Sequence, residues 1–260
     1  MEPKKALGQH WLKDPATLKT ICRAASLQDS DFVLEIGPGL GDLTRHILEQ
    51  AGRVVAVELD NELAASLRRH LPAQNLEIIS GNILEFDLTQ LPAGYKVVAN
   101  IPYYLTSNLI RVLADTANPP SLAVLLVQRE VAERIAAKAG EMSLLSVSAQ
   151  LFYEPQLGAV VPAKMFEPPP KVDSRVVVLR YRQQPLFEDL DTKTFFRLVK
   201  AGFAGRRKKL RGSLAAGLNI DKAQADQLLS QAKIDGNLRA QNLSLQDWHK
   251  LYKAYKSTNM

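Results

Sequence analysis

The sequence FVLEIGPGLGDLT occupies residues 32–44 and decides the fold predicted for this chain. An apolar run is followed by Gly37, Gly39 and Gly41, and a helical pattern comes next. A strand, a glycine loop and a helix in this order are typical of sheets that bind a nucleotide-like ligand where a strand ends. Strand and helix patterns alternate from residue 31 to about 181. The sequence therefore predicts an α/β domain with a mostly parallel sheet and helices on both faces.

Acidic residues around the glycine loop bear on the charge of its ligand. A dinucleotide fingerprint would need a third glycine where the chain has Asp42. A carboxylate at the start of a helix competes with a pyrophosphate for the same N–H groups and repels its charge. S-adenosylmethionine has an ammonium and a sulfonium group and no phosphate, so Glu35 and Asp42 would favour its binding. We therefore predict that Glu35 and the three glycines bind S-adenosylmethionine.

Polar residues at the ends of the next two predicted strands extend this site. The strand 53–57 leads to Glu58, roughly 20 residues downstream, where such folds present an acid to ribose hydroxyls. The strand 76–79 leads to Asn82, whose side-chain oxygen could accept from the adenine amine of the cofactor. A solvated carboxylate at Glu58 and a turn-forming Asn82 are the simpler alternatives.

The stretch Asn100-Ile101-Pro102-Tyr103 follows the predicted strand 95–99 and indicates a pocket for an exocyclic amine. The Asn100 side-chain oxygen and the Ile101 carbonyl could each accept one N–H of a flipped adenine, whose amine lone pair is otherwise delocalised into the ring. Pro102 would fix the turn that aims both acceptors, and Tyr103 would stack on the base. Taken alone, the stretch is more simply interpreted as an Asn-x-Pro turn without a catalytic role, and the other motifs favour the pocket.

Several separated motifs together resemble the ribosomal RNA adenine dimethyltransferases, and above all their bacterial small-subunit members. The resemblance covers nearly the whole chain, and the last two motifs make it specific. Its motifs are GQHWL (8–12), EIGPGLG (35–41), ELD (58–60), NIPY (100–103), QREV (128–131), LSV (145–147), FEPPPKVDS (166–174) and RRKKLR (206–211). The resemblance implies a Rossmann-like S-adenosylmethionine-dependent methyltransferase domain, closed by an antiparallel hairpin and followed by a smaller all-helical C-terminal domain.

The resemblance also implies an activity and further site residues. Two neighbouring adenines near the 3′ end of the small-subunit RNA would each be methylated twice during small-subunit biogenesis. His10 and Leu12 would close over the cofactor, and Phe166 would stack on the base opposite Tyr103. The other contacts implied are those of Gly37 with the methionine part, Glu58 with the ribose, Asn82 with the adenine and Asn100 with the reacting amine. The sequence departs from the family at His10, where Asn is usual, and at Asn82, where Asp is usual. Losing the charge of Asp bears on cofactor affinity rather than on the reaction.

The basic charge of the chain is concentrated at its C-terminal end. Residues 182–260 carry 15 basic and 7 acidic side chains, whereas residues 1–181 carry 18 and 20. We therefore predict a methyltransferase domain over 1–181 and a helical, basic RNA-binding domain over 182–260, divided near Gln183-Gln184-Pro185. The residues predicted to contact RNA are Arg206, Arg207, Lys208, Lys209 and Arg211. A solvated helix face is the alternative for this cluster.

The composition of the chain indicates a cellular compartment and excludes some kinds of ligand and partner. The single Cys22 excludes an intramolecular disulfide and fits a reducing cytoplasm. No apolar run has the length of a membrane span, and no His/Cys/Asp grouping has metal-ligand spacing. The expected partner is folded small-subunit ribosomal RNA within a precursor of the 30S particle, bound by a monomer. The alternatives left open are a large-subunit RNA methyltransferase, a DNA adenine methyltransferase and a non-catalytic RNA-binding assembly factor.

Overall fold

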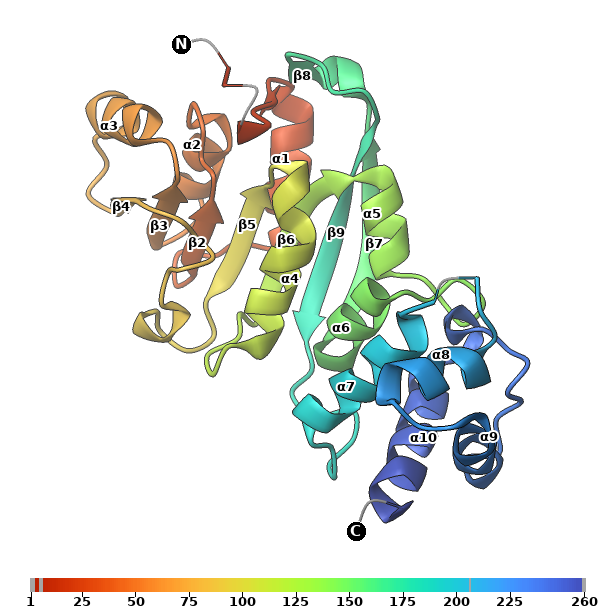
Figure 1. Ribbon diagram of the computed structural model, residues 1–260. Helices are drawn as coiled ribbons and strands as arrows, with labels where there is room; N and C mark the ends of the chain where they lie inside the picture. The colour runs from red at the N-terminus through yellow and green to blue at the C-terminus, as the bar shows by residue number, and fades with distance from the viewer. Residues whose placement is uncertain (1–2, 5–6, 206, 259–260) are drawn as a thin grey trace. The chain divides into compact units, whose positions relative to one another are not determined.

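The computed structural model describes residues 3–4, 7–205 and 207–258, and the chain forms two compact units (Figure 1). The first unit combines Met1–Glu133 with Tyr153–Tyr181, and the second combines Arg134–Phe152 with Arg182–Met260. The predicted division near residue 181 coincides with the end of the segment Tyr153–Tyr181 of the first unit. Residues 134–152, which the sequence assigned to the methyltransferase domain, belong to the helical unit instead, because their apolar side chains pack into its core.

A seven-stranded sheet forms the centre of the first unit, in the order β4-β3-β2-β5-β6-β9-β7. The five strands from β4 to β6 are parallel, and β9 pairs antiparallel with both β6 and β7. The strands are β2 (Phe32–Ile36), β3 (Arg53–Glu58), β4 (Leu76–Ser80), β5 (Lys96–Asn100), β6 (Leu122–Gln128), β7 (Tyr153–Val161) and β9 (Ser174–Tyr181). The α/β fold and the closing antiparallel hairpin are thus confirmed. Strand order reverses between β2 and β5, the place where open α/β sheets bind their ligands.

Helices on both faces bury the sheet. In Figure 1, α4 crosses in front of the sheet and α1 lies behind it. Asp14 begins α1 by accepting the N–H of Thr17, and Asp60 begins α3 by accepting those of Glu62 and Leu63, so both helices start at side-chain caps. The helices are α1 (Pro15–Ala25), α2 (Asp42–Leu48), α3 (Asn61–His70), α4 (Thr106–Asp115) and α5 (Arg129–Ile135), which runs across the division between the units, with short 3-10 turns η2 (Leu88–Gln90), η3 (Tyr103–Leu105) and η4 (Ala163–Met165).

Two features of the first unit were not predicted. The hairpin strands β7 and β9 are longer than the apolar runs at 159–161 and 176–179, which predict strands of only three and four residues. Pro155 and Gly158 hide β7 in the sequence, and they are tolerated there because β7 is an edge strand with a register shift between Leu157 and Val160. A separate two-stranded sheet pairs β1 (Trp11–Leu12) with β8 (Phe166–Glu167), which ties the N-terminal segment to a distant part of the chain.

The helical unit has its own apolar core. Trp248 and Phe195 are fully buried within it, and Val147 and Leu151 of α6 contribute to the same cluster. Helices α7 and α8 approach so closely that a Cβ at Gly217 would lie 2.5 Å from the Ala201 Cα atom. Its helices are α6 (Leu144–Phe152), α7 (Thr192–Phe203), α8 (Leu210–Leu218), α9 (Lys222–Gln231) and α10 (Leu245–Thr258), with the 3-10 turn η5 (Ala240–Asn242). Among the described residues, no helix combines the length and apolar character needed to cross a bilayer.

Candidate functional site

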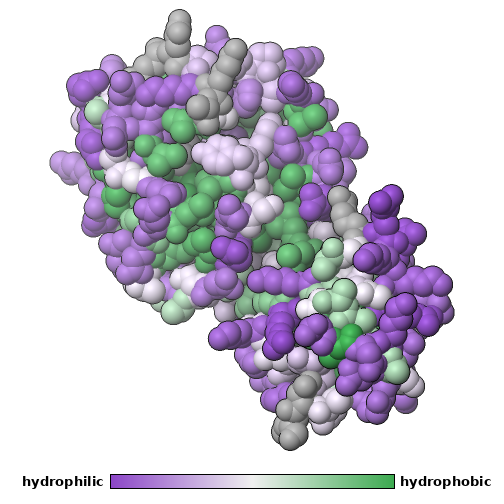
Figure 2. Space-filling model, in the orientation of Figure 1, coloured by the Kyte–Doolittle hydropathy of each residue, from purple (hydrophilic) through white to green (hydrophobic). Residues whose placement is uncertain are grey.

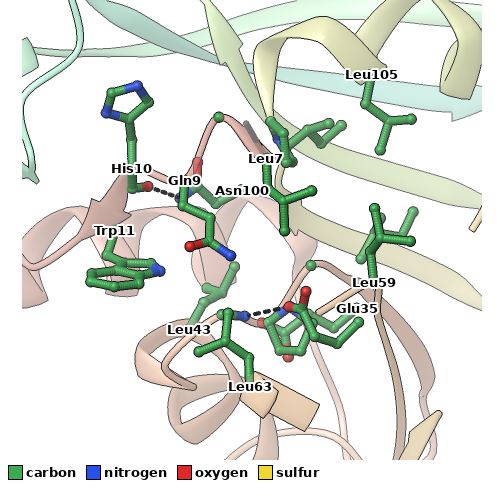
Figure 3. Close-up of a pocket in the computed structure, with 18 of the residues that line it drawn as sticks. Leu7, Gln9, His10, Trp11, Glu35, Leu43, Leu59, Leu63, Asn100 and Leu105 are labelled. Carbon is green, nitrogen blue, oxygen red and sulfur yellow. Dashed lines mark hydrogen bonds between the residues drawn. The ribbon is translucent and has the colours of Figure 1, made fainter. Parts of the chain in front are cut away.

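A pocket opens in the first unit where the parallel strands end (Figure 3). Five stretches far apart in the sequence line it, and Phe166 adds to its wall. The stretches are 7–12 before α1, 35–43 at the glycine loop without Gly41, 57–59 at the end of β3, 81–84 after β4 and 100–105 after β5. Except for Gly41, every residue of the first unit predicted to bind the cofactor or the base lines this pocket.

The glycine loop comes close to two other parts of the unit. Gly39 has φ +58°, and a Cβ there would lie 3.2 Å from the Trp11 ring. Gly41 has φ +84°, and a Cβ there would lie 2.6 Å from methyl carbons of Leu67 and Leu71. Gly41 therefore shapes the loop by packing against α3, whereas Gly39 allows the N-terminal segment to approach the pocket.

Glu58 joins the glycine loop to the end of β3. One carboxylate oxygen accepts the N–H of Gly39 at 3.0 Å, and the other accepts the N–H of Asp60 at 2.9 Å. The side chain is 6% exposed, and burial raises the pKa of Glu58 against the opposing effect of these two bonds. A buried carboxylate held at both oxygens has a fixed orientation, as a bidentate contact with two ribose hydroxyls requires.

Glu35, near the end of β2, is a buried acid with an incomplete set of hydrogen bonds. It is 1% exposed, and its Oε2 atom has no hydrogen-bond partner among the described residues. Burial raises the pKa of Glu35 to about 8; the nearby Thr44 hydroxyl acts against this shift, and the charge of Glu58 acts with it. A cation bound in the pocket would stabilise the ionised carboxylate, because an opposite charge favours the charged form.

The side chain of Asn100 is held in one orientation by the N-terminal segment (Figure 3). Its Nδ2 donates to the backbone carbonyl of His10 at 3.2 Å, so its Oδ1 is left as the acceptor on the pocket side. Ile101, 2% exposed, anchors the turn by donating its N–H to the Leu126 carbonyl at 3.2 Å. Pro102 has φ −54° and begins η3, as its ring constraint predicts.

The two aromatic residues predicted to stack on the base both line the pocket. The Tyr103 hydroxyl is 2.8 Å from the Ser174 Oγ atom, and its ring stacks on that of His10 with centroids 6.0 Å apart. Phe166 is 4% exposed and pairs with Leu12 across the β1–β8 ladder. The sequence motif contained Ser174 but gave it no role. In the structure it fixes the ring of Tyr103.

His10 and Asn82, the two departures from the family pattern, have partners of their own. His10 Nδ1 lies 2.7 Å from the carbonyl of Pro168, to which it donates. Asn82 accepts the N–H of Leu84 at 3.1 Å through Oδ1 and donates through Nδ2 to Oε1 of Glu85 at 2.9 Å. Sequence reasoning missed Glu85, although its spacing of three residues from Asn82 was a signal for a local turn contact.

A further group missed by sequence reasoning holds the N-terminal segment against α3. Lys4 pairs with Asp60 at 3.0 Å and with Glu62 at 2.8 Å, and Gln9 donates to Asp60 at 3.4 Å. Asp60 is 6% exposed, and its hydrogen bonds to Lys4 and to backbone N–H groups keep its pKa low despite its burial. The Lys4–Asp60 pair joins residues 56 positions apart, so no local pattern could have revealed it.

The basic cluster lies in the helical unit, in the loop between α7 and α8. Arg207, Lys208 and Lys209 are exposed, and Arg206 lies outside the described residues. Lys209 and Arg211 both donate to Oδ1 of Asn237, at 2.9 and 2.6 Å, and Arg211 lies 3.6 Å from a carboxylate oxygen of Asp226. The cluster occupies a loop and the first turn of α8 rather than one face of a helix.

Comparison with known proteins points in one direction. The family model described as "Ribosomal RNA adenine dimethylase" matches residues 2–257. "Ribosomal RNA small subunit methyltransferase A" of Dehalococcoides mccartyi strain CBDB1 is 41% identical, with 98% of this chain and 89% of the relative covered. The protein of the same name from Thermosynechococcus vestitus is 43% identical, with 94% of each chain covered.

Two solved structures are similar along nearly the whole chain. A dimethyladenosine transferase from Plasmodium falciparum has a TM-score of 0.83 and 27% identity, covering 96% of this chain and 99% of its own. The 23S rRNA methyltransferase ErmE has a TM-score of 0.75 and 28% identity, covering 95% and 99%. Their likeness extends over both units, so the helical unit is part of what these structures have in common with this chain.

Proposed function

The chain belongs to the ribosomal RNA adenine dimethylase family, and from this premise we propose that it dimethylates two adjacent adenines near the 3′ end of the small-subunit ribosomal RNA. It is an S-adenosylmethionine-dependent methyltransferase. The observation that carries the choice of reaction is the orientation of Asn100, whose Nδ2 is taken by the His10 carbonyl. The oxygen left facing the pocket can accept an N–H, as an adenine amine requires.

The residues of the pocket fit this cofactor. The unpartnered, buried Oε2 of Glu35 suits a ligand with cationic groups, and the doubly held carboxylate of Glu58 suits ribose hydroxyls. Gly37 leaves room beside them, since a Cβ there would meet only Pro102 at 3.9 Å, while Leu12 and His10 would cover the site. S-adenosylmethionine, when bound, supplies an electrophilic methyl group on a sulfonium.

Alignment of the target amine is the main catalytic contribution we assign to the protein. Asn100 and the Ile101 carbonyl would hold the two N–H groups, so that the nitrogen lone pair points toward the methyl group as it is released from conjugation. Positioning of this kind can contribute up to roughly 7–11 kcal/mol. No residue is needed as a general base, because an alkylated amine is acidic enough to lose its proton to water. Tyr103 and Phe166 would offset the few kcal/mol that flipping the base costs.

The helical unit is proposed as the RNA-binding domain, with Arg207, Lys208, Lys209 and Arg211 as phosphate contacts and Arg206 as a fifth. Basic side chains at the start of α8 oppose its dipole, an arrangement that does nothing for the helix and suits an incoming phosphate. The N–H groups of Leu210 and Arg211 already donate to the carbonyls of Leu238 and Gly236. Phosphates would therefore be contacted by side chains, and many hydrophilic residues lie on the face of this unit that Figure 2 shows.

The natural substrate that we propose is a precursor of the 30S particle, bound by a monomer in the cytoplasm. The curated relatives described above are named for the small subunit, and a shape-dependent, phosphate-rich interface fits folded RNA better than a single strand. A large-subunit RNA is the principal competing substrate, because the similar structure ErmE is a 23S rRNA methyltransferase.

Methyl transfer to small-subunit particles that lack adenine dimethylation tests this function. We expect dimethyladenosine in their RNA with the wild type, and a loss of about 10²–10³ in rate with Asn100→Ala, the range found when one preorganised polar contact is removed. Asn108→Ala, an exposed asparagine of α4, is the matched control and should keep the wild-type rate. Methylation of large-subunit RNA or DNA instead would reject the substrate, and an active Asn100→Ala variant would reject the site.

A further inference from the structure

Asn82 is held by two partners that require opposite ends of its amide. The N–H of Leu84 can be satisfied only by the Asn82 oxygen, and the carboxylate of Glu85 only by the Asn82 nitrogen. The Glu85 N–H also donates to the Asn82 carbonyl at 3.0 Å, which closes the turn. The side-chain amide therefore has one orientation, with the nitrogen engaged and one lone pair of the oxygen still to be filled.

The direction of this amide decides what the pocket can recognise. Asn82 lines the pocket, whereas Glu85 is exposed and does not. An amide free to rotate by 180° would offer either a donor or an acceptor, and would distinguish poorly between an amino and an oxo group on a purine. With its nitrogen held by Glu85, Asn82 offers an acceptor. The charged partner also polarises the amide and makes its oxygen a better acceptor.

We propose that Glu85 is a positioning residue that makes the cofactor site selective for a 6-amino purine. It acts through Asn82, by keeping the amide oxygen directed at the exocyclic amine of the cofactor's adenine. Where an Asp would be an acceptor whatever its rotation, the Asn82–Glu85 pair obtains the same result with two residues and keeps the negative charge one side chain away from the ligand. This inference rests on the proposed assignment of Asn82 to the adenine end of the pocket.

The effect of Glu85 on selectivity can be measured from the binding of two ligands that resemble the cofactor, without methyl transfer. S-adenosylhomocysteine carries a 6-amino group, and S-inosylhomocysteine carries an oxo group at the same place. By isothermal titration calorimetry, we expect the wild type to prefer the adenosyl ligand by about tenfold or more. The amino group of this ligand can donate to the Asn82 oxygen, whereas the oxo group of the inosyl ligand is repelled by it. Glu85→Ala should reduce this preference to less than about threefold, because the Leu84 N–H is then the one restraint left on the amide and no carboxylate polarises it.

Three variants separate positioning from other roles. Glu85→Gln can still accept from the Asn82 nitrogen and should keep the preference. Asp87→Ala removes a charge of the same sign two residues away, where Asp87 only caps η2, and should also keep it. In the double variant Asn82→Asp, Glu85→Ala, the carboxylate is an acceptor in every rotamer, so the preference should return. Thermal unfolding of each variant confirms that the fold is retained.

The outcomes distinguish this inference from the proposed function. A wild type that binds neither ligand overturns the cofactor site itself. A wild type that prefers the adenosyl ligand, with Glu85→Ala unchanged, leaves the site standing and overturns the role of Glu85. Equal losses in Glu85→Gln and Glu85→Ala would overturn positioning in favour of a direct effect of the charge.

Discussion

The acidic residues of the pocket and the basic residues of the helical unit differ in how the protein holds them. Glu35 and Glu58 are 1% and 6% exposed and lie in the wall of the pocket. Arg207 and Lys208 project from a loop into solvent. The first pair act as individually placed charges in a low-dielectric site, whereas the second pair act through their sum and are screened by salt.

A charge pattern in the sequence can therefore have two physical meanings. A buried acid changes its pKa, and the protein has to compensate it, so each one is a specific feature of the site. An exposed base costs the fold little and contributes to binding roughly in proportion to the phosphates it meets. The predictions below test whether the two regions behave in these two ways.

The largest effect is expected from the pH dependence of Glu35. Its pKa is raised from 4.5 to about 8 by burial, so the folded protein loses stability as pH rises from about 4.5 to about 8. At roughly 1.4 kcal/mol per pKa unit, the loss between pH 5 and pH 8.5 is roughly 4 kcal/mol. Glu35→Gln does not titrate and should lack this loss, as urea unfolding at the two pH values would measure. The exposed Glu62→Gln is the control, and a Glu35→Gln profile parallel to the wild type would contradict the burial argument.

We expect Glu58→Gln to weaken the free energy of binding of S-adenosylhomocysteine by roughly 2 kcal/mol. The amide keeps one oxygen, but its NH₂ group faces an N–H that the carboxylate accepted, so one of the bonds to Gly39 and Asp60 is lost. S-adenosylhomocysteine should then bind roughly 30-fold more weakly in calorimetry. Hydrogen exchange at Gly39 should speed up in the same variant. Unchanged affinity would show that Glu58 only fastens the loop and makes no contact with the ligand.

The sequence predicted the features of the structure that depend on neighbouring residues, and it missed those that depend on distant ones. Strands β3 and β5 were predicted to within one residue at each end, because parallel strands buried on both faces appear as continuous apolar runs. Strands β1 and β8 were missed because two residues carry no periodicity. The segment 134–152 was given to the wrong unit since a helical pattern does not show which core it will join.

The same distinction applies to the site. Asn100, Tyr103 and Glu58 were found because each follows a recognisable strand, the place where such sheets gather polar groups. Two groups that orient them were not found, because the His10 carbonyl and Ser174 come from remote positions in the sequence. Residue types can thus indicate a chemistry, while the orientation of an amide or a ring depends on interactions that only the folded chain creates.

The smallest effect separates two members of the basic cluster. Arg211 is bonded to Asn237 and lies near Asp226, so Arg211→Ala should lower the free energy of unfolding by about 1 kcal/mol. Arg207→Ala removes an exposed side chain and should leave stability within about 0.5 kcal/mol of the wild type.

For RNA binding, each change should reduce the slope of log K against log salt by about one for every phosphate that the variant no longer neutralises. Filter binding of small-subunit RNA between 50 and about 200 mM salt measures this slope. If Arg207→Ala alters neither slope nor affinity while Arg211→Ala only destabilises, the cluster is structural and the contrast with the pocket acids fails.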